Sequence, residues 1–395
     1  MKASRNPIRH AHWGLAGLTI VANAFASEPL ILIPDSLRDR VSAFRASDGS
    51  VVNLDFIPKD GRLVLPMQAV GTPWGTILVI DAGNVANVSG TDEVRLDDDA
   101  ILEYDLNGQY IRTLVTGLQV TGGQVKGLGE SFQGICVIGS TVYFTYCDTL
   151  CSGCSPAQMP GDQNAVWRID ADGTGLQVVC DAQSNPGLGV LRGITPIGPE
   201  PGFFLVADSG GDDLKYLGTD CAAFTWHDSN GANGIDFPQQ ICVLDPNFPT
   251  PFPDAAVVVA GFSQPSGLYL YDAYGVELFP YSVPTSPRGV HQLDNGEWIY
   301  TGGTMVRALN PITGVDRLIV DVVGPSGNFR WISRLDVAPP CPGDLDGSGS
   351  VDAGDIGTLL LLFGAGAGSP GDLDASGSVD AGDIGSLLLL FGACP

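Results

Sequence analysis

The sequence has few charged side chains, and very few of them are basic. Charged residues make up 16% of the 395 residues, and 19 Lys and Arg stand against 44 Asp and Glu, which gives a formal net charge of −25. Such a surface repels the phosphates of nucleic acids and anionic lipids, so nucleic acid is not an expected partner and cations are. The 44% hydrophobic content still allows a large core and argues against wholesale disorder.

The sequence also lacks an apolar run long enough to span a membrane, which requires about 20 residues. Its first nine residues include three basic ones, and a short, mostly apolar stretch follows from Trp13 to Phe25. Ala24-Phe25-Ala26 fits a cleavage site with small residues on either side of a variable one. We therefore expect a signal peptide over residues 1–26 and a secreted protein with no membrane span, rather than a short membrane anchor.

Residues and motifs typical of catalysis are scarce. The chain contains no Gly-x-Ser-x-Gly elbow and no phosphate-binding loop, and two histidines, His227 and His291, remain after the expected cleavage. His291 is a candidate to face a central channel, but a lone histidine lacks catalytic partners, so a structural role is preferred. Asp208, Asp212 and Asp213 are a candidate Ca²⁺ site, for which an exposed acidic turn is the preferred interpretation.

Nine cysteines fit an oxidising compartment, and their odd number leaves at least one outside any internal disulfide. Cys147, Cys151 and Cys154 have the spacing of the radical SAM iron–sulfur motif, which we reject because that fold is an oxygen-sensitive α/β barrel and this chain is β-rich. Disulfides in an insertion loop are preferred over a zinc site that uses these three and Cys180. The connectivity of the seven cysteines before residue 341 cannot be deduced from the sequence.

Two segments near the C-terminus are nearly identical and start 28 residues apart, at Gly343 and Gly371. They read GDLDGSGSVDAGDIGTLLLLFGA and GDLDASGSVDAGDIGSLLLLFGA. Each places oxygen-bearing residues at positions 1, 3, 5, 7, 9 and 12 of an EF-hand loop. The expected ligands are Asp344, Asp346, Ser348, Ser350 through its carbonyl, Asp352 and Asp355 in the first loop, and Asp372, Asp374, Ser376, Ser378, Asp380 and Asp383 in the second.

This pattern suits calcium, a hard cation that takes six to eight oxygen ligands. Gly349 and Gly377 stand at position 6, where the loop must turn sharply. Val351 and Val379, at position 8, are expected to join the two loops through a short β-bridge. Because two copies occur in the same register, an acidic turn that binds nothing is disfavoured. We expect two Ca²⁺ ions.

The repeats resemble dockerin type I repeats more than helix–loop–helix EF-hands. Asp replaces Glu at position 12, no helix-like segment precedes either loop, and the duplicated unit is short. The resemblance covers 55 of 395 residues. It implies binding to a cohesin-like module of an extracellular scaffold protein, often in assemblies that degrade polysaccharides. At loop positions 10 and 11, where dockerins often carry Ser or Thr, this chain has Ala353-Gly354 and Ala381-Gly382.

A helix is expected to begin near the end of each loop. An apolar stripe at i, i+3, i+4 and i+7 runs from Ile356 to Phe363 and again from Ile384 to Phe391, and Gly364 and Gly392 then stop the helices. Four further leucines widen the stripe and form either extra core, which is preferred in so small a module, or a docking surface: Leu361, Leu362, Leu389 and Leu390. Cys341 and Cys394 bracket the module, and we expect a disulfide between them.

Residues 28–337 lack long helical periodicity and show a recurrent β pattern instead. An apolar residue precedes a turn of Asp/Asn-x-x-Gly type, and an alternating strand follows, starting at Phe44, Tyr104, Ile169, Tyr271 and Leu309. A Gly-led apolar strand precedes several of these hairpins, at Gly134, Gly193 and Gly289. Repeats of this length with several strands each predict propeller blades.

Five blades are expected near 63–115, 130–182, 190–226, 238–283 and 288–321. A sixth would combine a strand near 328–337 with the hairpin 39–56, which removes the open sheet edges. Leu205-VADSGGDDLKYL resembles the strand pair of NHL propellers, and Ala165-VWRIDADGTGLQ resembles an SMP-30-like six-bladed repeat. A pair of β-sandwiches is the alternative fold.

The expected protein is therefore mainly β: a six-bladed β-propeller at 28–337, a linker at 338–343 and a small α-helical dockerin-like module with two calcium loops at 344–395. The leading hypothesis is an exported calcium-binding protein whose module attaches a ligand-binding propeller, for a carbohydrate or small molecule, to an extracellular scaffold or surface. The alternative is a propeller enzyme, a lactonase, lyase or glycoside-acting hydrolase, that the module targets.

Overall fold

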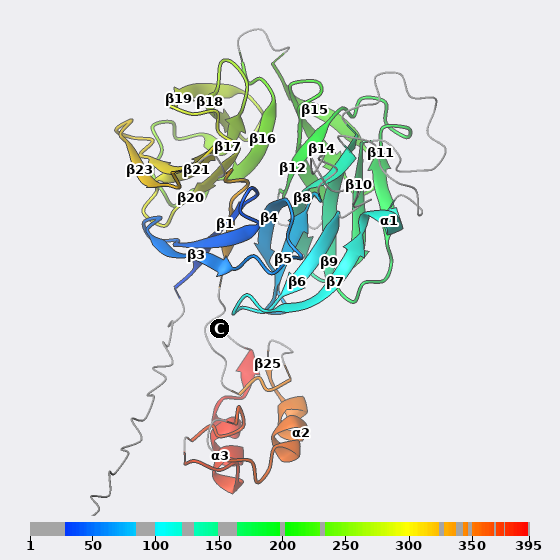
Figure 1. The fold of residues 1–395 in the computed structure, drawn as a ribbon, viewed down its shortest axis with the longest axis vertical. Helices are drawn as coiled ribbons and strands as arrows, with labels where there is room; N and C mark the ends of the chain where they lie inside the picture. The colour runs from blue at the N-terminus through cyan, green and yellow to red at the C-terminus, as the bar shows by residue number, and fades with distance from the viewer. Residues whose placement is uncertain are drawn as a thin grey trace, which may run out of the picture.

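The computed structural model describes residues 28–83, 99–120, 130–148, 164–197, 202–229, 234–323, 328–336, 343–346, 350–366, 369–374 and 376–393. The expected signal peptide and most of the expected linker lie outside these residues. The described residues form six four-stranded antiparallel sheets and, near the C-terminus, two short helices with a two-stranded sheet (Figure 1). Within the same residues, no helix is both long and apolar enough to cross a membrane.

Each four-stranded sheet is one blade, and we number the blades along the chain. Blade 1 holds β24 (Ser333–Leu335), β1 (Leu30–Asp35), β2 (Arg40–Arg45) and β3 (Val51–Ile57). Blade 2 holds β4 (Pro66–Gly71), β5 (Ile77–Asp81), β6 (Ala100–Tyr104) and β7 (Tyr110–Thr116), and the short helix α1 (Gly117–Val120) follows it. Blade 3 holds β8 (Glu130–Ile138), β9 (Thr141–Asp148), β10 (Ala165–Asp170) and β11 (Gln177–Asp181). Blade 4 holds β12 (Leu191–Pro196), β13 (Phe203–Asp208), β14 (Asp213–Gly218) and β15 (Ala223–Asp228). Blade 5 holds β16 (Pro238–Val243), β17 (Ala255–Gly261), β18 (Gly267–Asp272) and β19 (Glu277–Ser282). Blade 6 holds β20 (Gly289–Gln292), β21 (Trp298–Gly302), β22 (Met305–Leu309) and β23 (Asp316–Asp321).

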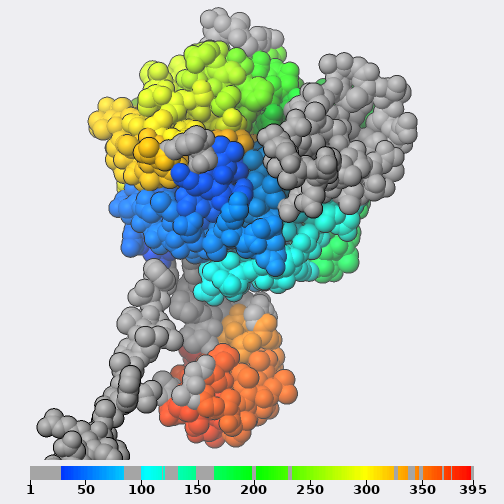
Figure 2. Space-filling model, viewed as in Figure 1, coloured from blue at the N-terminus to red at the C-terminus, as the bar shows by residue number. Residues whose placement is uncertain are grey.

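The six-bladed propeller is confirmed, and the β-sandwich alternative is wrong. The five expected blades match blades 2 to 6 closely. The expected closing blade omitted one strand, because β1 inserts between β24 and β2. Leu30 pairs with Leu335 and Leu32 with Ser333, so the end of the propeller chain closes the ring against its beginning. Figure 2 shows the dark-blue start of the chain beside the yellow-orange surface of blade 6.

The apolar core is divided among the spaces between the blades. Six clusters of buried side chains each draw on two neighbouring blades, including the pair formed by blades 6 and 1. Each blade therefore buries both of its faces, and the strands read as continuous apolar runs rather than as a simple alternation. Trp331 and Phe329, just before the closing strand, are fully buried in two of these clusters.

The expected Asp/Asn-x-x-Gly turns lock one blade onto the previous one. Asp105 accepts hydrogen bonds of 2.8 Å from the backbone N–H groups of residues 107 and 109, and Gly108 has a φ of 77°, a conformation that favours glycine. A Cβ atom on Gly108 would lie 2.4 Å from the carbonyl of Phe56 in blade 1. Gly275 is in the same position against the carbonyl of Trp226, at 2.1 Å. Glycine is required there for close approach as well as for the turn.

In blades 1, 2 and 4, the strand next to the innermost one ends in a buried aspartate whose carboxylate accepts hydrogen bonds from the nearby backbone. Asp81 accepts from the N–H groups of Val64, Leu65 and Gly83 at 2.8 to 3.1 Å, and Asp208 accepts from Gly189 and Gly210. Asp35 accepts from Asn328 in the same way. These contacts hold the loop before each innermost strand against the sheet.

Replacing one of these aspartates should be costly. Asp81→Ala is expected to lower the free energy of unfolding by at least about 2 kcal/mol, because it leaves three backbone N–H groups without their acceptor in a buried place. Denaturant unfolding followed by tryptophan fluorescence measures this. Asp172→Ala, which removes an exposed turn acceptor of Thr174, is the matched control and should cost less than about 1 kcal/mol. Equal losses in the two variants would contradict the role given to Asp81.

Candidate functional sites

Each C-terminal loop gathers three carboxylates. One oxygen each from Asp344, Asp346 and Asp355 lie within 4.8 Å of one another, and the same holds for Asp372, Asp374 and Asp383. Six of the twelve expected ligands thus meet as two triads with matching residues. Among the described residues, these are the clusters of three or more His, Cys, Asp or Glu side chains whose geometry suits a metal ion.

The last aspartate of each loop is held in place by the backbone. The carboxylate of Asp355 accepts from the N–H groups of Leu345, Asp346 and Asp352 at 2.6, 3.1 and 2.8 Å. Burial acts to raise the pKa of Asp355, but these hydrogen bonds outweigh it and hold the pKa below its usual value. Asp355 is therefore an ionised, rigid ligand candidate.

The second loop repeats this arrangement. Asp383 accepts from the N–H groups of Leu373, Asp374 and Asp380 at 2.7, 3.1 and 2.7 Å. The hydrogen bond from Asp380 contributes most to lowering the pKa of Asp383. Because both copies keep the same geometry to within about 0.1 Å, the duplication preserves three-dimensional structure as well as sequence.

The remaining expected ligands divide into three groups. Asp352 and Asp380 are the N-caps of helices α2 (Ala353–Leu361) and α3 (Ala381–Leu389), and each accepts from the N–H group two residues later. In the second loop, the Gly377 N–H donates to Asp372 at 3.1 Å, and the Ser376 hydroxyl donates to the carbonyl of Ser378. Ser350 opens the short strand β25 (Ser350–Val351), whereas Ser348 and Gly349 lie outside the described residues.

The expected bridge between the two valines at position 8 is wrong. Val351 pairs with Gly392 in β26 (Gly392–Ala393), and the second loop pairs through a bridge between Ser378 and Gly366. Each loop therefore pairs with the segment that follows the other repeat's helix. Val351 and Val379 instead point into the module core, beside Leu359 and Leu387.

The expected helices are present, but most of the extra leucines do not join the core. Leu361 is 87% exposed and Leu389 is 89% exposed, and Leu390 is also exposed, whereas Leu362 packs against the core. The preference for core is thus wrong for three of the four. A nine-residue helix turns one narrow stripe inward, so the neighbouring positions face outward. Together with the other exposed apolar side chains they form what we call the apolar helix faces: Leu360, Leu361, Phe363, Leu388, Leu389, Leu390 and Phe391.

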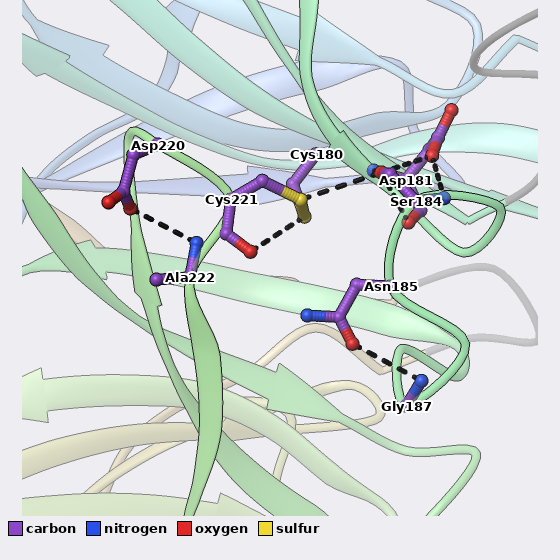
Figure 3. Close-up of a disulfide and its surroundings, with 8 residues drawn as sticks. All are labelled: Cys180, Asp181, Ser184, Asn185, Gly187, Asp220, Cys221 and Ala222. Carbon is purple, nitrogen blue, oxygen red and sulfur yellow. Dashed lines mark hydrogen bonds between the residues drawn. A yellow bond between two sulfur atoms is a disulfide. The ribbon is translucent and has the colours of Figure 1, made fainter.

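Cys180 forms a disulfide with Cys221, with Cα atoms 4.9 Å apart (Figure 3). It joins β11 of blade 3 to the turn between β14 and β15 of blade 4. The alternative zinc site that included Cys180 is therefore wrong, because that sulfur is already bonded. Cys151 and Cys154 lie outside the described residues, and so do Cys341 and Cys394, whose pairing stays a prediction.

The candidate histidines and the acidic turn have structural partners. His227 bonds the Gly275 carbonyl through Nδ1 and packs against Tyr271, while His291 is half-buried in β20 with its Nδ1 2.8 Å from the carbonyl of Gln292. In the acidic turn, Asp213 pairs with Lys215 at 2.5 Å. Asp208 and Asp213 are buried, so the preferred description of this turn as exposed is wrong.

One end of the propeller channel carries a ring of residues that the sequence did not single out. The innermost strands are β24, β4, β8, β12, β16 and β20, and their topology places all their starts at the same end. Cβ atoms on Gly134, Gly193 and Gly289 would meet the carbonyls of Arg192, Gln239 and Arg330 in the next blade, which identifies equivalent positions. The ring contains Met67, Gln133, Arg192, Gln239, Arg288 and Arg330.

Comparison with known proteins gives the fold and little more. No protein family and no curated protein matches the chain. A solved nidogen/laminin complex has a chain that is 13% identical with a TM-score of 0.53, covering 78% of this chain and 98% of that one. A gluconolactonase from Xanthomonas campestris is 16% identical with a TM-score of 0.49, and the match covers 74% of this chain and 86% of the gluconolactonase chain. A calcium-binding regucalcin from Agrobacterium tumefaciens is 10% identical with a TM-score of 0.45, and the match covers 70% of this chain and 81% of the regucalcin chain.

At these identities the likeness concerns the fold. The chain is a six-bladed β-propeller protein, and it carries a C-terminal pair of acidic loops, each followed by a short helix.

Proposed function

We propose that this is an exported protein in which a dockerin-like module binds two Ca²⁺ ions and attaches a ligand-binding propeller to an extracellular scaffold or surface. A cohesin-like protein is the proposed partner, in the setting of polysaccharide degradation. The observation that carries the proposal is the pair of carboxylate triads, built twice with the same residues and the same backbone hydrogen bonds. Three carboxylates that converge this closely repel one another unless a cation joins them.

The apolar helix faces support the attachment role. Monomeric proteins seldom expose neighbouring large apolar residues, and such patches mark sites of association. Here each repeat exposes a Leu-Leu pair at the end of its helix, Leu360-Leu361 and Leu388-Leu389. The loops order the start of each helix through Asp355 and Asp383, so calcium binding would also fix the faces that a partner contacts.

Export has two supports. The first is the signal-peptide pattern at the N-terminus, and the second is the Cys180–Cys221 disulfide, which persists in oxidising compartments. The enzyme alternative has no comparable support: among the described residues, both metal-type clusters lie in the module rather than at the channel.

Calcium titration calorimetry on the full chain tests the metal sites. We expect two ions per chain, with dissociation constants on the order of 10⁻⁴ M or tighter, as in extracellular modules. The double variant Asp344→Ala/Asp372→Ala should lose both events, because each change removes a carboxylate from one triad. Asp254→Ala/Asp321→Ala, which removes the same charge from the propeller surface, is the control. Equal calcium uptake by the two double variants would refute the sites.

The attachment role is tested on the surface of the source cells. The exported full chain should be retained there in millimolar calcium and released by a chelator, and Leu361→Glu/Leu389→Glu should abolish retention without altering calcium uptake. Val323→Glu, another highly exposed apolar position but in the propeller, is the matched control and should be retained. Retention of the Leu361/Leu389 variant would exclude the apolar helix faces as the attachment surface.

A further inference from the structure

We propose that Arg192, Arg288 and Arg330, at one end of the propeller channel, bind the oxyanion group of a small hydroxylated organic acid such as a hexuronic acid. This inference names a ligand class for the propeller. It rests on the proposed function only in treating the propeller as the ligand-binding part, and the calcium sites play no part in it.

The three arginines converge because of the ring geometry. They occupy equivalent positions at the starts of the innermost strands of blades 4, 6 and 1. Arg192 lies over the ring of Phe237 at 5.2 Å, and Arg288 lies over the ring of Phe262 at 4.2 Å. These two phenylalanines are themselves neighbours, with centroids 6.0 Å apart. Both guanidinium groups are thus held beside the mouth of blade 5, by stacking rather than by ion pairing.

The hydrogen bonds of these arginines go to neutral acceptors. Arg192 donates to Gln133 at 2.8 Å and to Ser209 at 3.2 Å, and Arg330 donates from Nε to the Ser36 hydroxyl at 2.8 Å. Within the described part of the chain, none of the three forms an ion pair. Several other arginines of the propeller do pair with carboxylates: Arg38, Arg40, Arg45, Arg62, Arg112, Arg307, Arg317 and Arg334.

This arrangement is unusual in a chain with more than twice as many acidic as basic residues. Burial, and then repulsion from the other arginines, lowers the pKa of both Arg288 and Arg330. Three positive charges therefore face one another with no counter-charge from the described residues. An anion bound between them would relieve the repulsion and accept hydrogen bonds from the guanidinium N–H groups that have no other partner. The planar guanidinium group matches the two oxygens of a carboxylate.

The surroundings indicate a hydroxylated body rather than an inorganic ion. Near this end of the propeller lies a cavity of about 370 Å³ that the arginines themselves do not line; it is formed mainly by small and polar residues of two loops, Gln264–Ser266 and Ser282–Ser286. The second loop leads directly into Arg288, and both loops leave their blade at the end of the channel where the ring lies. In the ring itself, the buried Gln239 has an amide Nε2 without an acceptor among the described residues. Hydroxyl groups would find polar partners here.

The test compares one acid with its neutral counterpart. Calorimetry on the full chain at pH 7, with D-glucuronate and D-glucose as probes, should show binding of glucuronate and none of glucose. Arg288→Gln should weaken glucuronate binding by about tenfold or more, because it removes one charge-assisted contact. The Arg288 side chain makes no described hydrogen bond, and its backbone N–H bond to the Thr301 carbonyl is kept in the variant, so Arg288→Gln should fold, and its melting temperature checks that it does. Arg62→Gln, which removes an exposed arginine elsewhere in the propeller, is the control and should bind like the parent protein.

The inference would be overturned by no glucuronate binding to the folded parent protein at millimolar concentration, by equal binding of glucose, or by unchanged affinity in Arg288→Gln. Titrations with inorganic sulfate and phosphate test whether a simple oxyanion is sufficient. If either ion binds as tightly as glucuronate, the organic acid is overturned as the ligand. The Asp344→Ala/Asp372→Ala variant should bind glucuronate normally. A parent protein that takes up calcium but does not bind glucuronate would thus reject this inference and leave the proposed function standing.

Discussion

Removal of calcium is expected to loosen the C-terminal module by at least about 100-fold in amide exchange while the propeller keeps its protection. The two triads place six carboxylates in the loops, and an ion that binds the folded state alone stabilises it by about 2.7 kcal/mol when its concentration is 100 times the dissociation constant. Hydrogen exchange with and without a chelator measures the change. The amides of α2 and α3 should respond, and those of the inner strands should not.

The same experiment on the Asp344→Ala/Asp372→Ala variant provides the control. Its helices should exchange fast with or without calcium, because neither loop retains a complete triad. If the parent protein protects α2 and α3 equally in chelator, the four-residue apolar core would be sufficient by itself to fold the module, and calcium would not be coupled to its folding.

Truncation is expected to have opposite effects on the two sides of the closing strand. A chain that ends at Pro340 keeps β24 and should melt like the full-length propeller. A chain that ends at Val323 loses β24 together with the buried Phe329 and Trp331, and we expect it to be unfolded or insoluble at 25 °C. Loss of a single large buried aromatic side chain costs about 3 to 5 kcal/mol, and the whole stability of a domain is about 5 to 15 kcal/mol.

Near-UV circular dichroism of the two purified chains, or their soluble yield, decides the matter. A folded, cooperatively melting chain that ends at Val323 would show that closure through β24 is dispensable. If the chain that ends at Pro340 unfolds instead, the exposed Leu361 and Leu389 would be in contact with the propeller, and the module would be a structural cap rather than a tether.

What the sequence predicted depends on how local each feature is. The blades were predictable because Asp-x-x-Gly turns carry their conformation in a few adjacent residues, as at Asp105 and Gly108. Strand β1 was missed because Leu30–Asp35 is a short apolar run with no turn before it, and its inner partner comes from the other end of the propeller. Pairing over such a separation leaves no local signal.

The candidate sites follow the same division. The two acidic loops repeat a contiguous pattern, so the convergence of Asp344, Asp355 and their copies could be predicted from spacing alone. Which loop pairs with which segment could not, because Val351 has a partner from beyond the second helix. The arginine ring left a partial signal in the dipeptides Arg192-Gly193 and Arg288-Gly289. Arg330 lacks the glycine, and only the closed ring of blades shows that the three positions are equivalent.

The pairing of β1 with β24 also sets the order in which the molecule can be completed. A ribosome makes β1 first and β24 last among the propeller strands, so the edge of β1 must wait for nearly the whole domain to be synthesised. Unpaired edges invite wrong association while they wait, and contacts this distant in sequence form slowly. The module follows β24 in the chain. With the anchoring role that we propose, the module would be made only after the last propeller strand, so a propeller that still lacks β24 would have no anchor.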